Sequence, residues 1–141
     1  MKKVLIVLVV IIAGYFSAAY FLTPVEGDVE GGVTIILIDE FGNEISNETF
    51  DFESEMSLFE LLNIEYDISC ADSGYQADET CDFEQLGSHI ILEIDELQTD
   101  WNSSYIQIFV GETASNFGID RIMLEDNTTY VFKYVDLGGG N

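Results

Sequence analysis

Residues 57–62, which read SLFELL, decide the fold class because they carry the clearest helix signal in the chain. Ser57 and Glu60 have the spacing of a capping box, in which each side chain satisfies a backbone N–H group near the other residue. Ser54 offers an alternative cap one turn earlier. The leucines at 58, 61 and 62, together with Phe59, recur at helical spacing, which predicts a short helix that packs on a core and ends near residues 63–66.

Strand patterns flank this helix on both sides. Residues 33–39 (VTIILID) are apolar on both faces, which is typical of a central strand. A turn at Gly42-Asn43 leads to a return strand at 45–53, in which Phe50 and Phe52 share one face. Further strand patterns follow at 89–95, 105–110 and 129–135. This order predicts an α+β fold in which one helix packs on a mixed or antiparallel sheet.

The N-terminus predicts a membrane or export segment. Two lysines precede residues 4–22, an apolar and small-residue stretch of 19 residues. Such a stretch can span a bilayer as a retained anchor, and it also fits a cleaved signal peptide with a cut site at 17–19. A cytosolic core helix is the third reading. No cysteine lies near the stretch, so a lipid anchor on cysteine is excluded.

The expected domain organisation follows from this assignment. Residues 1–24 form the signal anchor or signal peptide, 25–32 a linker, 33–137 the folded domain and 138–141 a tail. Both main readings leave the lysines inside and export the remainder. We therefore expect a single-pass membrane protein with an extracellular C-terminal domain, which contacts the membrane through residues 4–22, or else a secreted protein.

The charge of the chain excludes nucleic-acid binding. There are 27 acidic residues against four basic ones, for a net charge of −23, which repels phosphate backbones and anionic lipid headgroups. Three readings of the acidic surface remain: a solvated face, a surface for cations or a basic partner, and a high-salt habitat. In each case added salt should stabilise the fold by screening the self-repulsion.

Two cysteines, Cys70 and Cys81, lie in the exported part and predict a disulfide, with a free or redox-active pair as the alternative. Closing a loop of this length stabilises a fold by about 3 kcal/mol in the chain-entropy model. We expect no metal centre built on histidine or thiolate, because no such cluster is visible. The oxygen-rich segment around the cysteines leaves weak Ca²⁺ binding open, with Asp72, Asp78, Glu79 and Asp82 as the candidate ligands.

The sequence predicts no catalytic residue. His89 is the only histidine. Ser88 is adjacent, and neighbours on a strand point to opposite faces, so the two are poor material for acyl transfer. Carboxylates are too abundant for a glycosidase pair to be identified. An enzyme that acts on the cell wall is therefore a minor alternative.

The C-terminal half carries a recognisable pattern of aromatic, apolar and glycine positions. It consists of Ile90-x-Leu92-x-Ile94-Asp95, Trp101-x3-Tyr105, Val110-Gly111-x2-Ala114, Gly118-Ile119, Leu124-x-Asp126 and Tyr130-x-Phe132-x-Tyr134. The pattern resembles the bacterial domain family related to the C-terminal domain of transcobalamin and intrinsic factor. In the N-terminal half, Met56–Leu62 (MSLFELL) resembles the start of that family's helix. The resemblance covers about 105 residues.

The chain departs from the family at three places. Val110-Gly111 stands where the family has Asn-Gly, and Asp126-Asn127-Thr128 stands where it has Asp-Gly-Asp. The second change is mild, because asparagine tolerates positive φ almost as glycine does. The Cys70–Cys81 segment is not part of the family pattern.

The resemblance implies a β-grasp-like mixed sheet with one packed helix, in an extracellular setting and often on a tether. In transcobalamin-type proteins this domain covers one side of a corrinoid that a separate helical barrel holds. These 141 residues contain no such barrel. The primary expectation is therefore that the chain binds no cofactor. Cobalamin is the alternative ligand.

The expected function is that of an exported, membrane-anchored and non-catalytic binding module at the cell surface. Its partner is an unknown surface protein or small molecule, and an accessory corrinoid-type binder is the alternative. Trp101 is either a core residue whose ring closes the end of the sheet or a surface for ligand stacking or partner contact. The candidate contact residues lie on either side of the strand at 105–110: Trp101, Tyr105, Gly111, Ala114, Ser115, Asn116 and Gly118.

Overall fold

The computed structural model describes residues 27–138, which form a mixed α+β fold made mostly of sheet with one α-helix. The α+β prediction is confirmed. The predicted signal or anchor at 1–24, the start of the linker and most of the tail lie outside the described residues. Between residues 27 and 138, no helix is long and apolar enough to cross a membrane.

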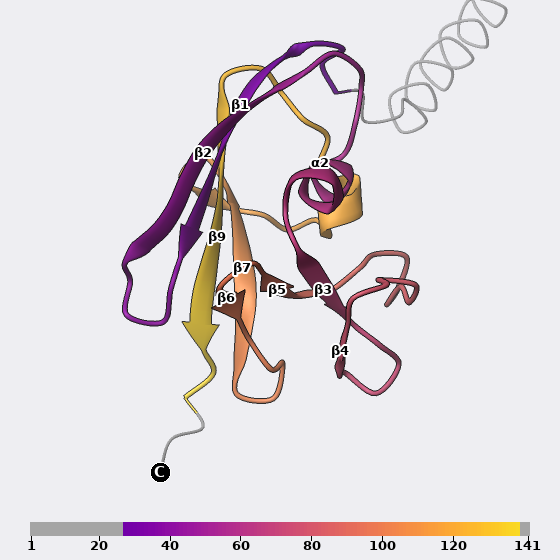
Figure 1. Cartoon of the computed structure of the whole chain (residues 1–141), viewed down its shortest axis with the longest axis vertical. Coiled ribbons are helices and arrows are strands. Elements are labelled where there is room, and N and C mark those ends of the chain that lie inside the picture. The colour runs from indigo at the N-terminus through magenta and orange to yellow at the C-terminus, as the bar shows by residue number, and fades with distance from the viewer. Residues whose placement is uncertain (1–26, 139–141) are drawn as a thin grey trace, which may run out of the picture.

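The larger sheet has five strands in the order β2-β1-β9-β7-β8. They are β2 (Glu44–Phe52), β1 (Gly31–Ile38), β9 (Thr128–Asp136), β7 (Ser104–Val110) and β8 (Thr113–Ala114). The central pair, β1 and β9, is parallel, and the other neighbours are antiparallel. Figure 1 shows β1 and β9 side by side although they lie at opposite ends of the described chain.

The predicted central strand is β1, which lies between β2 and β9. Its alternate residues Val33, Ile35 and Leu37 are at most 1% exposed, and Tyr130 and Phe132 on β9 are fully buried beside them. The predicted turn between β1 and β2 is present, because the Asp39 carboxylate accepts hydrogen bonds from the N–H groups of Phe41 and Asn43.

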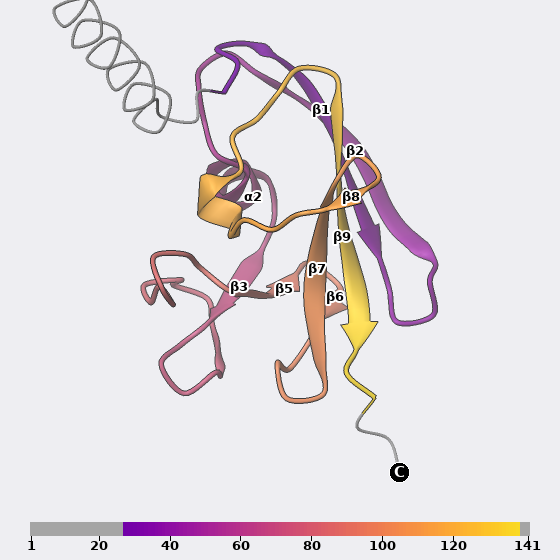
Figure 2. The same ribbon diagram turned by 180° about the vertical axis from the view of Figure 1, so that it is seen from behind.

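The helix α2 (Leu58–Glu65) begins as the sequence predicts. Ser57 is the N-cap and forms a complete capping box with Glu60, so the alternative cap at Ser54 is not used. Leu58, Leu61 and Leu62 are buried on the face that the periodicity indicates. The N–H of Leu58 donates to the carbonyl of Ile122, which ties the helix start to the 3-10 helix η1 (Ile119–Arg121). Figure 2 shows η1 beside α2.

A second, smaller sheet has the order β4-β3-β5-β6 and consists of short strands. These are β4 (Ala77–Asp78), β3 (Ile68–Ala71), β5 (Ile91–Ile94) and β6 (Leu97–Gln98). The predicted strand at 89–95 is therefore shorter than expected. A register shift opposite Ser69 and Cys70 leaves Ile91 and Leu92 both buried, so the simple alternation through Ile90 was wrong.

The predicted disulfide is confirmed. Cys70 and Cys81 are bonded, with their Cα atoms 5.0 Å apart, and both are buried. Cys70 lies on β3, and Cys81 lies in the connection between β4 and β5. The bond therefore fixes that connection against the small sheet.

Candidate functional site

A tight hairpin turn at residues 85–88 sets up a cluster of hydrogen-bonded polar side chains. Gln85 and Ser88 exchange both backbone hydrogen bonds, and the two residues between them, Leu86 and Gly87, have φ values of 54° and 80°. Two consecutive positive φ angles are the signature of a two-residue hairpin turn. The turn reverses the chain so that Glu84 and His89, its flanking residues, face each other across it.

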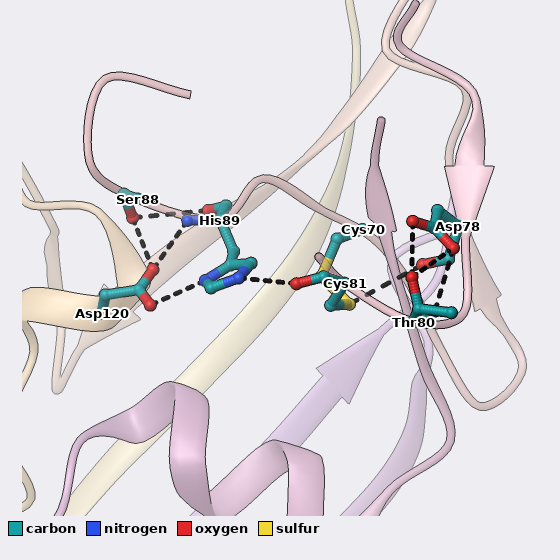
Figure 3. The surroundings of a disulfide bond; sticks show 7 residues. All are labelled: Cys70, Asp78, Thr80, Cys81, Ser88, His89 and Asp120. Atoms are coloured by element: carbon teal, nitrogen blue, oxygen red, sulfur yellow. Dashed lines mark hydrogen bonds and ion pairs between the residues drawn. A yellow bond between two sulfur atoms is a disulfide. The ribbon is translucent and has the colours of Figure 1, made fainter. Parts of the chain in front are cut away.

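The ring of His89 is held on three sides, and Figure 3 shows the two polar contacts, with Asp120 and with the Cys81 carbonyl. Its Nδ1 lies 2.7 Å from Asp120 Oδ1, and its Nε2 lies 2.8 Å from the carbonyl oxygen of Cys81. The ring of Phe59, on α2, stacks on it with centroids 4.0 Å apart and planes 3° from parallel. His89 thereby joins the helix, the disulfide connection and η1.

Both ring nitrogens of His89 face oxygen atoms. A carbonyl oxygen and an ionised carboxylate both accept hydrogen bonds and cannot donate them. Cys81 and Asp120 therefore confine the imidazole in its plane, and Phe59 confines it across its face.

Asp120 is the centre of the hydrogen-bond network. Its Oδ2 accepts from Ser88 Oγ at 2.8 Å and from the backbone N–H of His89 at 2.7 Å. Burial opposes ionisation of this carboxyl, but the hydrogen bonds from His89 and Ser88 outweigh it and hold the pKa of Asp120 below its usual range. Gly118 makes the approach possible, because a Cβ there would collide with the Ser88 side chain.

The arrangement of Ser88, His89 and Asp120 differs from that of a hydrolase triad. In a triad the serine hydroxyl faces the histidine nitrogen that does not bind the aspartate. Here that nitrogen, Nε2, faces the Cys81 carbonyl, and Ser88 donates to Asp120 instead. The expectation that Ser88 and His89 point to opposite faces was wrong, because both precede β5 and converge on one carboxylate.

Three side chains of this cluster are close enough to hold a metal ion. One ligand atom each from Glu84, His89 and Asp120 lies within 4.8 Å of the other two. Glu84 is exposed, whereas His89 and Asp120 are partly buried. The sequence pointed to none of the three as ligands. The short turn between Glu84 and His89 was the one available signal, whereas nothing local indicates Asp120, 31 residues from His89.

The acids proposed for calcium lie elsewhere. Among residues 27–138, none of the four belongs to the group that could hold a metal. The Asp72 carboxylate accepts from the N–H groups of Gly74 and Gln76, and that of Asp78 accepts from Thr80. Glu79 lines a separate acidic hollow with Asp67, Glu93 and Asp95. Weak calcium binding by this loop stays a prediction.

Trp101 lies on the surface at the start of β7 rather than in the core. It is 37% exposed, its plane is 2° from that of Tyr75 with centroids 6.1 Å apart, and Tyr105 meets it edge-on. Tyr75 lies in the loop that the disulfide closes. It belongs to this aromatic cluster, and nothing in the sequence indicated it. Both Tyr75 and Trp101 have positive φ, at 59° and 64°. This exposure is at odds with the core reading, and contact of Trp101 with a ligand or partner stays a prediction.

Four of the other candidate contact residues lie at the far end of β7. Gly111 turns the chain into β8 with φ 62°, and Ala114, Ser115 and Asn116 line a pocket of about 330 Å³. A seven-residue strand, roughly 20 Å long, separates them from Trp101. The structure therefore splits the predicted contact face between the two ends of β7, with Gly118 apart from both, against Ser88. Contact at each place remains a prediction.

Comparison with known proteins yields a likeness of fold. No protein-family model matches the chain, and no curated protein matches it. A solved structure from Ruminococcus gnavus ATCC 29149, of a protein for which metal binding has been suggested, superposes with a TM-score of 0.57 at 18% identity. The match covers 76% of this chain and 98% of that one. The resemblance to the transcobalamin-related family stays a prediction.

Proposed function

We propose that the chain is an exported, non-catalytic binding module that holds a divalent metal cation between Glu84, His89 and Asp120. The observation that carries the proposal is the convergence of these three ligand atoms within 4.8 Å. The suggested metal binding of the Ruminococcus gnavus protein with a similar fold supports the same class of ligand.

The donor set selects the type of metal. One imidazole nitrogen and two carboxylate oxygens suit a first-row transition ion such as Zn²⁺, whereas Ca²⁺ and Mg²⁺ prefer sites built from oxygen alone. Three protein ligands leave at least one coordination position for water or for a ligand from a partner. Such a site would suit a module that engages another molecule through its metal.

The surroundings of His89 are those of a metal-binding histidine. Such residues commonly donate their second ring N–H to a carbonyl or carboxylate, which fixes the ring for coordination. Here Nε2 meets the Cys81 carbonyl, and Nδ1 faces Asp120. A cation would be held by Nδ1 of His89 together with Asp120, and Ser88 would orient the other oxygen of Asp120.

The contacts of His89 also support a non-catalytic role, because its Nε2 is engaged by a carbonyl and does not face the Ser88 hydroxyl. Export is supported by the Cys70–Cys81 disulfide, which is typical of an oxidising compartment. The strand order β2-β1-β9-β7, with its parallel central pair, supports the β-grasp-like description. Tethering through residues 4–22 completes the proposal.

The metal site is tested by titrating the full-length chain with Zn²⁺ and with Ca²⁺ and recording Tm and the heat of binding. Zn²⁺ should raise Tm, because a ligand that binds only the folded state stabilises it by about 2.7 kcal/mol at one hundred times Kd. Ca²⁺ at the same concentrations should have a much smaller effect. Replacing Zn²⁺ by Co²⁺ should give visible absorption bands that report the coordination.

Glu84→Gln is the informative variant, because Glu84 is exposed and its loss leaves the His89 network intact. Its Zn²⁺ affinity should fall at least about tenfold. Asp82→Asn is the matched control, since it removes one charge from the same connection and should retain wild-type affinity. Equal affinities in the two variants, or no saturable Zn²⁺ binding by the native chain, would refute the metal site.

Export is tested on intact cells that express the native chain. An externally added protease should digest the domain while cytosolic markers survive, and thiol labelling without reductant should find no free cysteine. A chain that is protected from the protease and has two reactive thiols would place the domain in the cytosol and contradict this part of the proposal.

A further inference from the structure

A second concave site, distinct from the metal cluster, lies where β7 and β8 meet the chain that leads into β9. It is a pocket of about 330 Å³. Its walls are largely apolar and include Val110, Ala114, Phe117, Ile122, Met123 and Tyr130. Pockets of this size and character are typical of small-molecule sites, in which a few polar groups fix the orientation of an apolar ligand.

The hydroxyl of the tyrosine that lines this pocket is not free to bind a ligand. Tyr130 is fully buried, its hydroxyl donates to the carbonyl of Met123, and it accepts the N–H of Glu125. The Ser115 hydroxyl is likewise engaged by the backbone of Phe117. A ligand therefore meets a largely apolar interior, and its polar end is left for the other polar groups of the lining, Thr113 and Asn116, and for the charged ones. Phe117, which is 65% exposed, extends this apolar surface into solvent.

Arg121 is the cationic group of this pocket. It is the sole arginine of a chain with a net charge of −23. Within the part of the chain that the structure describes, its guanidinium forms no salt bridge. A guanidinium matches a carboxylate with two parallel hydrogen bonds. On a molecule that otherwise repels anions, Arg121 marks a place where one negative group is accepted.

We propose that this pocket binds a small organic monocarboxylate, with its apolar body among Ala114, Phe117 and Met123 and its carboxylate on Arg121. Glu125 also lines the pocket and disfavours a second negative charge on the ligand. The proposal gives Ala114, Ser115 and Asn116 a role near a ligand. It does not depend on the metal site, since none of the three residues of that site lines the pocket.

The test uses the full-length chain and three probes that share a phenyl ring: phenylacetate, 2-phenylacetamide and 2-phenylethylammonium. Binding is measured by calorimetry and by the shift of the Met123 methyl resonance. Phenylacetate should bind saturably and at least about tenfold more tightly than the neutral amide, as expected for a charge-assisted contact. The ammonium should bind no more tightly than the amide.

Two pairs of variants separate this site from general charge effects. Arg121→Met should weaken phenylacetate about tenfold and leave the amide unchanged, whereas Lys133→Met, which removes the same charge from the exposed face of β9, should change neither. Ala114→Phe should abolish binding of both probes by filling the pocket. Glu84→Gln should leave phenylacetate binding intact, so that failure of the metal site and failure of this site are distinguishable.

Three results would overturn the proposal. One is the absence of saturable phenylacetate binding by the native chain. Another is an equal loss of affinity in Arg121→Met and Lys133→Met, which would indicate only the overall charge. The last is binding that persists in Ala114→Phe while Tm shows that this variant is folded, because the probe would then lie elsewhere.

Discussion

The two sheets of this molecule are stabilised in different ways. Four strands of the five-stranded sheet, β1, β2, β7 and β9, have seven to nine residues, and their continuous apolar face includes Ile35, Leu37 and Phe132. The four-stranded sheet has strands of two to four residues, and the Cys70–Cys81 bond also stabilises it. A further cross-link is the His89 bridge, the contacts of the His89 ring with Asp120 and with the Cys81 carbonyl. Short strands form few hydrogen bonds with their neighbours. The smaller sheet is therefore stabilised by specific cross-links, whereas the larger sheet is stabilised by the length of its strands.

The largest effect should come from the core of the five-stranded sheet. Phe132→Ala removes a fully buried ring from β9 and should lower the free energy of unfolding by about 3–5 kcal/mol. Urea unfolding followed by circular dichroism measures it. The adjacent exposed residue supplies the control, since Lys133→Ala should change stability by no more than about 0.5 kcal/mol. Similar losses in both variants would contradict the core assignment.

The next effect should come from the disulfide. Replacing Cys70 and Cys81 together by alanine should cost about 3 kcal/mol, because the closed loop no longer restricts the unfolded chain. Hydrogen exchange sharpens the comparison: amides in β3 and β5 should lose more protection than those in β1 and β9. A uniform loss over both sheets would show that the small sheet does not open on its own.

A smaller effect is expected at the His89 bridge. His89→Phe keeps the stacking on Phe59 but leaves the Cys81 carbonyl without its partner, which should cost about 1–3 kcal/mol. Ser88→Ala, which removes one of the donors to Asp120, should cost less. Thermal unfolding in metal-free buffer measures both variants, and a neutral His89→Phe would mean that the bridge adds no stability.

The smallest effect should have the opposite sign. The Tyr66 hydroxyl is buried and has no hydrogen-bond partner within residues 27–138. Burial, reinforced by the charge of Glu48, raises the pKa of Tyr66 to about 12. Tyr66→Phe removes an unsatisfied group and should leave stability unchanged or raise it by up to about 1 kcal/mol at neutral pH.

The pH dependence of Tyr66→Phe gives a second check. A group with a raised pKa in the folded state contributes stability that is fully present below pH 10 and is lost as the pH rises towards 12. The variant should therefore lose less stability than the native chain between about pH 10 and 12, as measured by chemical unfolding. An identical alkaline decline in both would place the titration on another tyrosine.

Much of the larger sheet could be read from the sequence because its signals are local. The capping box at Ser57 and Glu60, the apolar strand at 33–39 and the turn at Asp39–Asn43 each depend on residues a few positions apart. The short strands β4 and β6 carry no such signal, because two residues are too few to show a period. The register shift opposite Ser69 and Cys70 could not be foreseen, because pairing with another strand decides it.

The candidate sites could likewise be predicted only in part from the sequence. Trp101 and Ala114–Asn116 were identified as contact candidates from their residue types, but their separation by the length of β7 became evident only in three dimensions. Tyr75 joins Trp101 from the disulfide loop. Arg121 meets an apolar pocket that the loop at 114–117 and the chain before β9 form together.

The sequence by itself determined the secondary structure of the long segments, the α+β class and the pairing of the two cysteines, because periodicity, capping and a count of two require no knowledge of distant contacts. Tertiary structure alone decided that β1 pairs in parallel with β9 and that Glu84, His89 and Asp120 converge. The physical reason is that packing of the apolar faces fixes these arrangements across long stretches of chain. A polar cluster is then assembled by the fold around it, from residues whose own neighbours in the sequence give no sign of it.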